Sequence, residues 1–228
     1  MSNLILREEK GSPLTHTEMD NNIKTLNRGG RLIDTIYYDQ PGTFEYVKKD
    51  YVKFIVVEMV GGGGGSGGCA ATITGQYLTS SPGGGAGYSK KKILYDDLLI
   101  SETVIIGDGG IAGIAGNNAG GTGGTTSFGT HSSATGGGGG GGSGTNSGTI
   151  TTSGHVGLGG SGVGDLVLNG CAGRGHYSSV TYANTSVFGR SHLSHYGDGA
   201  YGVGNRQNSA AKPGIDGNSG IVIIHEYE

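Results

Sequence analysis

The sequence predicts a mostly irregular and β fold, in which a short N-terminal helix and β-strands frame a glycine-rich domain of packed polyglycine II helices. Glycine occupies 52 of the 228 positions and is concentrated in solid runs at 61–65 and 136–142. Strand-like apolar segments alternate with the glycine runs. Glycine also recurs at every third position, in the registers Gly107, Gly110, Gly113 and Gly116; Gly154, Gly157 and Gly160; and Gly214, Gly217 and Gly220.

A spacing of three residues matches the polyproline II type of helix, which has three residues per turn. Where such helices pack closely, as in collagen, a residue without a side chain is required at every third position. The alternative is a flexible glycine linker, because glycine and serine bias is also typical of disorder. The apolar segments between the runs favour the packed bundle, since a linker does not need them.

The N-terminal segment predicts a helix from His16 to about Leu26. Thr15 and Glu18 have the spacing of a capping box. Leu14 and Met19 have the spacing of a hydrophobic staple around it. Met19, Ile23 and Leu26 form a single apolar stripe on an otherwise polar helix, so the stripe needs a partner. Such a short helix is marginal alone, and copies of the same chain are the simplest partner.

Residues 32–60 predict β-structure around a Pro41-Gly42 turn, ending in a strand from Val52 to Val60 that runs directly into Gly61. Residues 92–106 and 166–168 look like further strands. The closing segment, residues 220–228, predicts a strand that pairs with the strand before Gly61. That pairing would hold the two ends of the glycine-rich region together.

Composition limits the classes of function. Only 33% of residues are hydrophobic and Trp is absent, so a conventional core is not expected and backbone hydrogen bonds must stabilise much of the fold. The net charge of −3 gives no electrostatic case for nucleic-acid binding.

No signal peptide or long apolar run is present, which favours synthesis in a cytoplasm and reduced thiols. A Cys69–Cys171 disulfide stays open as an alternative.

Motifs for catalysis and cofactors are weak. Glycine-rich matches such as the one at 107–110 do not open a helix after a strand, so dinucleotide binding is not predicted. A near match to a calcium β-roll repeat at 159–166 does not recur. His192 and His195 have helical metal spacing, but exposed contact residues are the favoured interpretation. No nucleophile has a recognisable base beside it, so the sequence predicts no enzyme, no cofactor and no metal.

Residues 174–201 stand out because they combine aromatic and cationic residues with Ser, Thr, Asn and Gly. This mixture is typical of binding loops, where aromatics supply contact area and small polar residues adapt. The candidate binding residues are Arg174, His176, Tyr177, Tyr182, Phe188, Arg190, His192, His195, Tyr196 and Tyr201. A Tyr-rich loop packed on its neighbours is the alternative. The excursions at 71–82, 144–153 and 205–213 would lie beside it if the glycine helices are antiparallel.

Two stretches resemble known proteins. The opening Gly11-Ser12-Pro13-Leu14-Thr15 and Glu18-Met19-Asp20-Asn21-Asn22 resembles the start of many bacteriophage tail-fibre proteins. The remainder is similar to the glycine-rich C-terminal domain of phage tail fibres and to the adhesins that cap long tail fibres. The matching segments are Gly61 to Gly65, Gly84 to Tyr88, Thr103 to Gly110, Ser127 to Gly129 and Pro213 to Ile223.

The resemblance implies a phage tail fibre, a virion component assembled in the host cytoplasm. Residues 1–31 would attach and trimerise through Leu14, Met19, Ile23 and Leu26, residues 32–60 would form a β-rich neck, and residues 61–228 would form the distal domain. The implied partners are the chain itself as a homotrimer, other tail or baseplate proteins, and a host polysaccharide or outer-membrane protein. Nucleic acid and membrane insertion are not implied. The cap adhesins lack a fibre-like N-terminus of their own, a difference that favours a trimer here.

Two other functions are alternatives to receptor recognition. The first is a purely structural baseplate or fibre connector without receptor contact. The second is a fibre depolymerase, which would require a carboxylate cluster on a parallel β-helix. The sequence offers neither the repeat nor the cluster.

Overall fold

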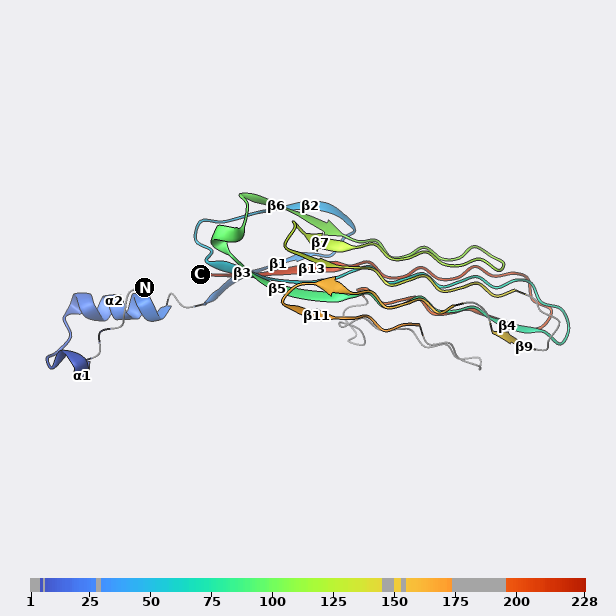
Figure 1. Ribbon diagram of the computed structural model, residues 1–228, viewed down its shortest axis with the longest axis horizontal. Helices are drawn as coiled ribbons and strands as arrows, with labels where there is room; N and C mark the ends of the chain where they lie inside the picture. The colour runs from blue at the N-terminus through green and yellow to red at the C-terminus, as the bar shows by residue number, and fades with distance from the viewer. Residues whose placement is uncertain (1–4, 6, 28–29, 145–149, 153–154, 174–195) are drawn as a thin grey trace.

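The chain forms an elongated molecule with three parts (Figure 1). The computed structural model describes residues 5, 7–27, 30–144, 150–152, 155–173 and 196–228. A helical segment lies at the N-terminal end, a β-sandwich follows it, and glycine-rich segments extend from the sandwich to the opposite end. The fold is mostly β, with one short N-terminal helix, two five-stranded antiparallel sheets and a small three-stranded sheet.

The N-terminal helix begins with the predicted capping box. Helix α2 (His16–Asn27) follows a single helical turn, α1 (Arg7–Lys10). The Thr15 N–H donates to Glu18 Oε2 (2.7 Å), and the Glu18 N–H donates to Thr15 Oγ1 (3.2 Å). Lys10 forms an ion pair with the same carboxylate. A hydrogen bond from the Lys10 side chain, followed by those from Thr15, lowers the pKa of Glu18 to about 2.

The sandwich consists of sheets A and B. Sheet A contains, in spatial order, β1 (Leu32–Tyr38), β13 (Ile221–Tyr227), β3 (Phe54–Val60), β5 (Tyr88–Leu94) and β11 (Leu166–Leu168). Sheet B contains β10 (Gly162–Val163), β8 (Ser132–Ala134), β7 (Thr126–Phe128), β6 (Ser101–Ile106) and β2 (Gly42–Val47). The strands therefore come from almost the whole chain after residue 31.

The predicted pairing of the closing strand is confirmed. Strands β13 and β3 are antiparallel neighbours, with Ile221 opposite Val60 and Tyr227 opposite Phe54. The strand at 166–168 is also present as β11. The segment 92–106 is not one strand, because a 3₁₀ turn at Tyr95–Asp97 separates β5 from β6. This turn lets the chain pass from sheet A to sheet B.

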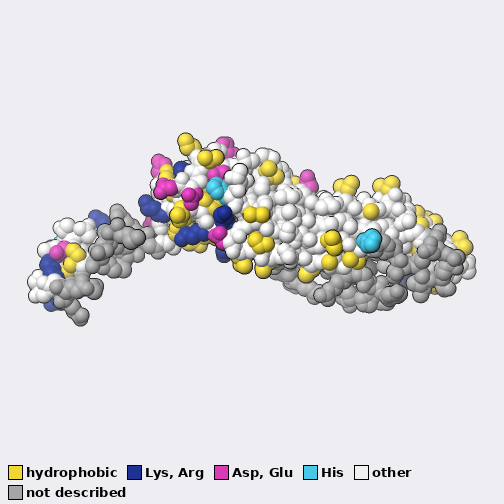
Figure 2. Space-filling model, viewed as in Figure 1, with side chains coloured by type: hydrophobic (Ala, Val, Ile, Leu, Met, Phe, Trp, Pro, Cys, Tyr) yellow, Lys and Arg dark blue, Asp and Glu magenta, His cyan; other side chains and the backbone are white. Residues whose placement is uncertain are grey.

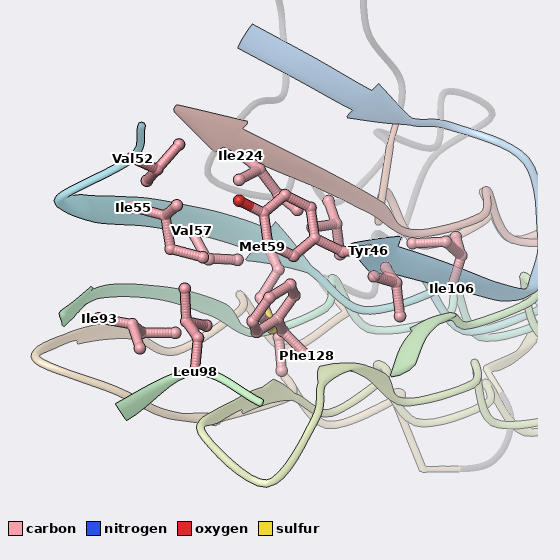
Figure 3. Close-up of a cluster of buried hydrophobic side chains, with 13 residues drawn as sticks. Tyr46, Val52, Ile55, Val57, Met59, Ile93, Leu98, Ile106, Phe128 and Ile224 are labelled. Carbon is pink, nitrogen blue, oxygen red and sulfur yellow. The ribbon is translucent and has the colours of Figure 1, made fainter. Parts of the chain in front are cut away.

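A hydrophobic core fills the space between the sheets (Figure 3). Tyr46, Ile55, Met59 and Phe128 are among its fully buried side chains. The expectation that no conventional core exists was therefore wrong for this part of the chain. The low overall hydrophobic fraction conceals the core, because the apolar residues are concentrated in the strands.

A buried carboxylate lies at the margin of this core. Glu226 on β13 is fully buried, and its Oε1 accepts a hydrogen bond from the Tyr46 hydroxyl (3.0 Å). Its Oε2 accepts a hydrogen bond from Lys49 Nζ (2.7 Å). Burial and the neighbouring Glu226 raise the pKa of Tyr46, so the phenol stays a donor. A buried charge is tolerated only with such partners.

The glycine segments beyond the sandwich are joined by backbone hydrogen bonds. In residues 61–69, each successive N–H donates to a different neighbouring segment, and the fourth N–H returns to the first. The donor and acceptor pairs are Gly62 with Gly124, Gly63 with Asn218, Gly64 with Gly84, Gly65 with Gly121, Ser66 with Ile215, Gly67 with Ser81 and Gly68 with Asn118. The direction of the hydrogen bonds therefore repeats every three residues.

Segment 61–70 is surrounded by six described segments. Its N–H groups donate to 118–124, 212–218 and 81–84, which run antiparallel to it. Its carbonyls accept from 107–116, 136–143 and 197–203; the first two run parallel to it over three successive bonds each. Segments 155–161 and 169–173 pack outside this ring. We call all these segments the glycine bundle.

Close approach of the backbones explains why glycine is required. A Cβ added at Gly62 would lie 1.9 Å from the Asp108 carbonyl oxygen, and one added at Gly63 would lie 2.0 Å from that of Asp198. Real Cβ atoms do not approach other atoms this closely. A Cβ at Gly113, in one of the predicted registers, would lie 2.3 Å from the Asn118 carbonyl oxygen.

Candidate functional site

The far end of the bundle carries a small sheet and its loops. Strand β4 (Tyr77–Thr79) pairs with β12 (Gly204–Asn205) on one side and with β9 (Ile150–Thr152) on the other. The described strands of the predicted excursions at 71–82, 144–153 and 205–213 therefore lie together, with residues 150–152 representing the second, at the end of the molecule opposite α2 (Figure 1). We call the described loops 71–79 and 205–210 the distal tip.

Local hydrogen bonds shape the first tip loop. The Gln76 N–H donates to the Ile73 carbonyl (3.1 Å), and the Ile73 N–H donates to Gln76 Oε1 (3.1 Å). Gly75 has a φ of +81°, which a residue with a side chain rarely adopts. A tight turn therefore presents Ile73 and Thr74 to solvent.

The second loop is tied to the first by side chains. The Gly75 N–H donates to Gln207 Oε1 (3.0 Å), and Thr74 Oγ1 donates to Asn208 Oδ1 (3.0 Å). Asn208 has a φ of 53°, a left-handed conformation that Asn tolerates better than most residues. These bonds hold the two loops in one arrangement.

Beneath the loops, buried polar residues fix the backbone. Asn205 is almost fully buried, and its Nδ2 donates to the carbonyls of Ala70 and Ala210, both at 2.8 Å. Thr72 is also buried, and its N–H donates to the Ser209 carbonyl (2.9 Å). The tip is thus supported from inside the bundle rather than by an apolar core.

The exposed side chains of the tip have the chemistry of a recognition surface. Ile73 is 67% exposed and Tyr77 is 44% exposed. Arg206, Gln207 and Asn208 are exposed beside them. Aromatic, Arg and amide side chains on preorganised loops are typical of sites that bind proteins or sugars. The sequence predicted these loops only as minor neighbours of the main binding segment, because each contains few aromatic, Arg or amide residues.

Most candidate binding residues predicted from composition lie outside the described residues. These are Arg174, His176, Tyr177, Tyr182, Phe188, Arg190, His192 and His195. Tyr201 is described; it is 46% exposed and comes three residues before β12. Tyr196 is described as well, and it lies elsewhere.

Tyr196 lies where the bundle meets the sandwich, not at the tip. Its ring packs on a buried cluster that includes Val60, Tyr88 and Ile221. Its hydroxyl is 3.5 Å from Asp39 Oδ2. Partial burial and the nearby Asp39 raise the pKa of its hydroxyl. Replacing Tyr196 would therefore disturb packing, and it is a poor probe of binding.

The predicted attachment residues lie on or beside α2. Met19 is 47% exposed, Ile23 is 53% exposed and Leu14 is half-buried. Leu26 is near the end of the same helix. Within the described residues, no other element of the chain covers Met19 or Ile23, so these two residues face solvent in one copy of the chain.

Other candidate chemistry is sparse. Cys69 is buried and Cys171 is exposed, and both are free thiols; burial raises the pKa of Cys69. Across the described ranges, no group of three or more His, Cys, Asp and Glu side chains is arranged to hold a metal ion. No helix among them is long and apolar enough to span a bilayer.

A comparison with protein-family models finds no match, and a search of curated protein sequences finds no similar protein.

Proposed function

We propose that the chain is a phage tail-fibre or receptor-binding protein that attaches to the virion through its N-terminus and recognises the host surface through its distal loops. The observation that carries the proposal is the arrangement of the two ends. An exposed apolar stripe on α2 lies at one end, and hydrogen-bonded loops with exposed Tyr77 and Arg206 lie at the other. A protein that connects two bodies needs two such ends.

The glycine bundle is the rod between these ends, and its segments are polyglycine II helices. Three observations support this assignment: hydrogen bonds that repeat every three residues, six neighbours around segment 61–70, and backbones too close for a Cβ. Residues 61–70 would then span about 31 Å, at roughly 3.1 Å per residue. Because every N–H of residues 61–70 donates to a neighbouring segment, the rod is held together without a large apolar core.

A rigid rod favours recognition at the tip. Loops that are already ordered lose less conformational entropy when they bind, so more of the contact energy appears as affinity. On the face in Figure 2, the described part of the bundle shows few charged side chains, whereas charged groups gather over the sandwich.

The assembly is a homotrimer that docks to other tail or baseplate proteins near α2. The host partner is a surface polysaccharide or an outer-membrane protein. Both suit the tip, because an exposed tyrosine ring stacks on a sugar face as well as on a protein loop. A structural connector without receptor contact is the competing function, and the experiment below separates the two.

We expect the double substitution Tyr77→Ala with Arg206→Ala to abolish adsorption of the purified chain to cells of the bacterium that the phage infects. Each true anchor contributes at least about 2 kcal/mol, roughly a thirtyfold loss of affinity, and a trimer multiplies the loss through avidity. Fluorescently labelled protein and flow cytometry measure adsorption. Cells stripped of surface polysaccharide distinguish the two receptor classes.

The matched control is Arg31→Ala with Tyr51→Ala, an exposed arginine and an exposed tyrosine near the N-terminal end of the sandwich. The control should adsorb like the parent chain, and both variants should keep its melting temperature. If the parent chain binds no cells, the connector function is the better one. Undiminished adsorption of a folded tip variant would place recognition outside the distal tip.

A further inference from the structure

The outer face of sheet A is unusually apolar. Alternate residues of its strands point into the core, and their neighbours point outward. The outward apolar residues are Tyr37, Phe54, Val56, Leu94, Ile223 and Tyr227. An antiparallel sheet with one solvated face normally carries polar residues on that face. We call this surface the outer face of sheet A.

The described chain leaves this face partly open, with Phe54, Val56, Ile223 and Tyr227 half-buried. Tyr37 is 63% exposed and Leu94 is 53% exposed. Tyr196 covers only the margin next to the bundle, where it packs beside Val60 and Ile221. No described helix packs on the remainder. By contrast, the inner face of the same sheet is fully buried at Ile55, Val57 and Met59.

Several polar groups on this face have partners within the chain. Glu58 Oε1 forms an ion pair with Lys90 (2.8 Å), and Glu58 Oε2 accepts a hydrogen bond from the Tyr88 hydroxyl (2.8 Å). Burial opposes ionisation of Glu58, but these partners outweigh it and lower its pKa. Lys92 Nζ lies 3.9 Å above the ring of Phe54, which stacks on Tyr227. Covering this surface would still remove the Glu58–Lys90 pair from water, so the pairing reduces the electrostatic cost of covering it without removing that cost.

The area of the outer face of sheet A, compared with that of known interfaces, indicates what covers it. Four strands of seven residues present roughly 450 Å², from strand spacings of about 4.8 Å and rises of about 3.4 Å. The apolar side of α2, with its twelve residues, adds roughly 180 Å². A standard interface buries about 800 Å² per partner, with a lower limit near 600 Å². Neither surface is sufficient alone, whereas the two together just reach that lower limit.

We propose that the outer face of sheet A is the interface between copies of this chain, continuing the contact made by α2. The inference rests on the trimer of the proposed function. The copies pack around a common axis with Tyr37 and Leu94 covered by neighbouring copies. Three short helices are then not required to hold the assembly alone, which is consistent with their marginal stability.

The test compares two double variants of the full chain. Tyr37→Lys with Leu94→Lys places charges on the outer face of sheet A. Val47→Lys with Ile105→Lys places them on the outer face of sheet B, at residues 55% and 40% exposed. Sedimentation velocity over a dilution series measures the concentration at which half of the trimer has dissociated. All four positions are on the surface, so circular dichroism should show folded chains.

We expect the sheet A variant to raise this concentration at least tenfold, while the sheet B variant behaves like the parent. A sheet A variant that matches the parent would overturn the inference and leave the trimer intact. Equal weakening by both variants would also overturn it, since the effect would not be specific to the face. A monomeric parent chain would contradict the inference and the proposed trimer together, whereas receptor recognition is tested separately by adsorption.

Discussion

Replacing Gly63 by alanine is expected to prevent the chain from folding. The added Cβ would lie 2.0 Å from the Asp198 carbonyl oxygen and 2.8 Å from the Gly199 nitrogen. Segment 61–70 has neighbours on all sides, so it cannot move away from one without colliding with another. Overpacking costs about 1–3 kcal/mol in ordinary cores, and the cost here should exceed about 5 kcal/mol because backbone meets backbone.

Gly204→Ala is the matched control for this prediction. A Cβ there would meet only the Leu78 carbonyl oxygen, at an ordinary 3.7 Å. Its free energy of unfolding should change by less than about 1 kcal/mol. Urea titration followed by tyrosine fluorescence measures both variants. Equal, small effects would mean that the glycine segments are not closely packed.

The same close packing predicts different losses of stability for substitutions at two further glycines. Gly113→Val should lower the melting temperature clearly, because the added Cβ would lie 2.3 Å from the Asn118 carbonyl oxygen. Gly144→Val should have a smaller effect, since its nearest neighbour is the side chain of Asn117, which can rotate away.

Lys49→Met is expected to destabilise the sandwich by about 3 kcal/mol. The substitution leaves the fully buried Glu226 carboxylate without its cation, and breaking a buried ion pair from one side typically costs about 3–5 kcal/mol. We expect the lower end of this range because Lys49 is 33% exposed, so water can approach the carboxylate. The free energy of unfolding from urea titration tests the value.

Arg31→Met is the control, because the side chains of its ion pair, Arg31 and Glu228, are 68% and 30% exposed and such pairs contribute at most about 1 kcal/mol. The contribution of Lys49 to the free energy of unfolding should also depend on pH. Its hydrogen bond to Glu226 raises the pKa of Lys49 from 10.5 to about 12, although burial opposes the shift. The stabilisation is therefore complete below pH 10.5 and is lost as the pH rises toward 12. A difference between variant and parent that does not shrink over this range would contradict the assignment.

Local patterns predicted the elements whose causes are local. The spacing of Thr15 and Glu18 is enough to define the start of α2, because both hydrogen bonds lie within four residues. The glycines at every third position predicted close packing for the same reason, since the repeat itself records where side chains are forbidden.

The contacts between residues far apart in the chain could not be predicted from the sequence. Residues 221–224 are all apolar, so they do not show which face of the closing strand is buried. The inward position of Glu226 depends on partners far away in the sequence, Tyr46 and Lys49. For a similar reason, the sequence did not predict the distal tip as the main recognition surface. Neither Tyr77 nor Arg206 stands out in the sequence, and their segments come together only through the pairing of β4 with β12.

The most direct test of the account is to block each end of the molecule in turn. Biotin is attached either at the N-terminus or at an Ile73→Cys substitution in a Cys171→Ser background, which removes the exposed thiol. Streptavidin is then added before the protein meets the cells. We predict that streptavidin at residue 73 abolishes adsorption, whereas streptavidin at the N-terminus leaves it unchanged. Adsorption that survives the block at residue 73 and is lost with the block at the N-terminus would contradict recognition by the distal tip.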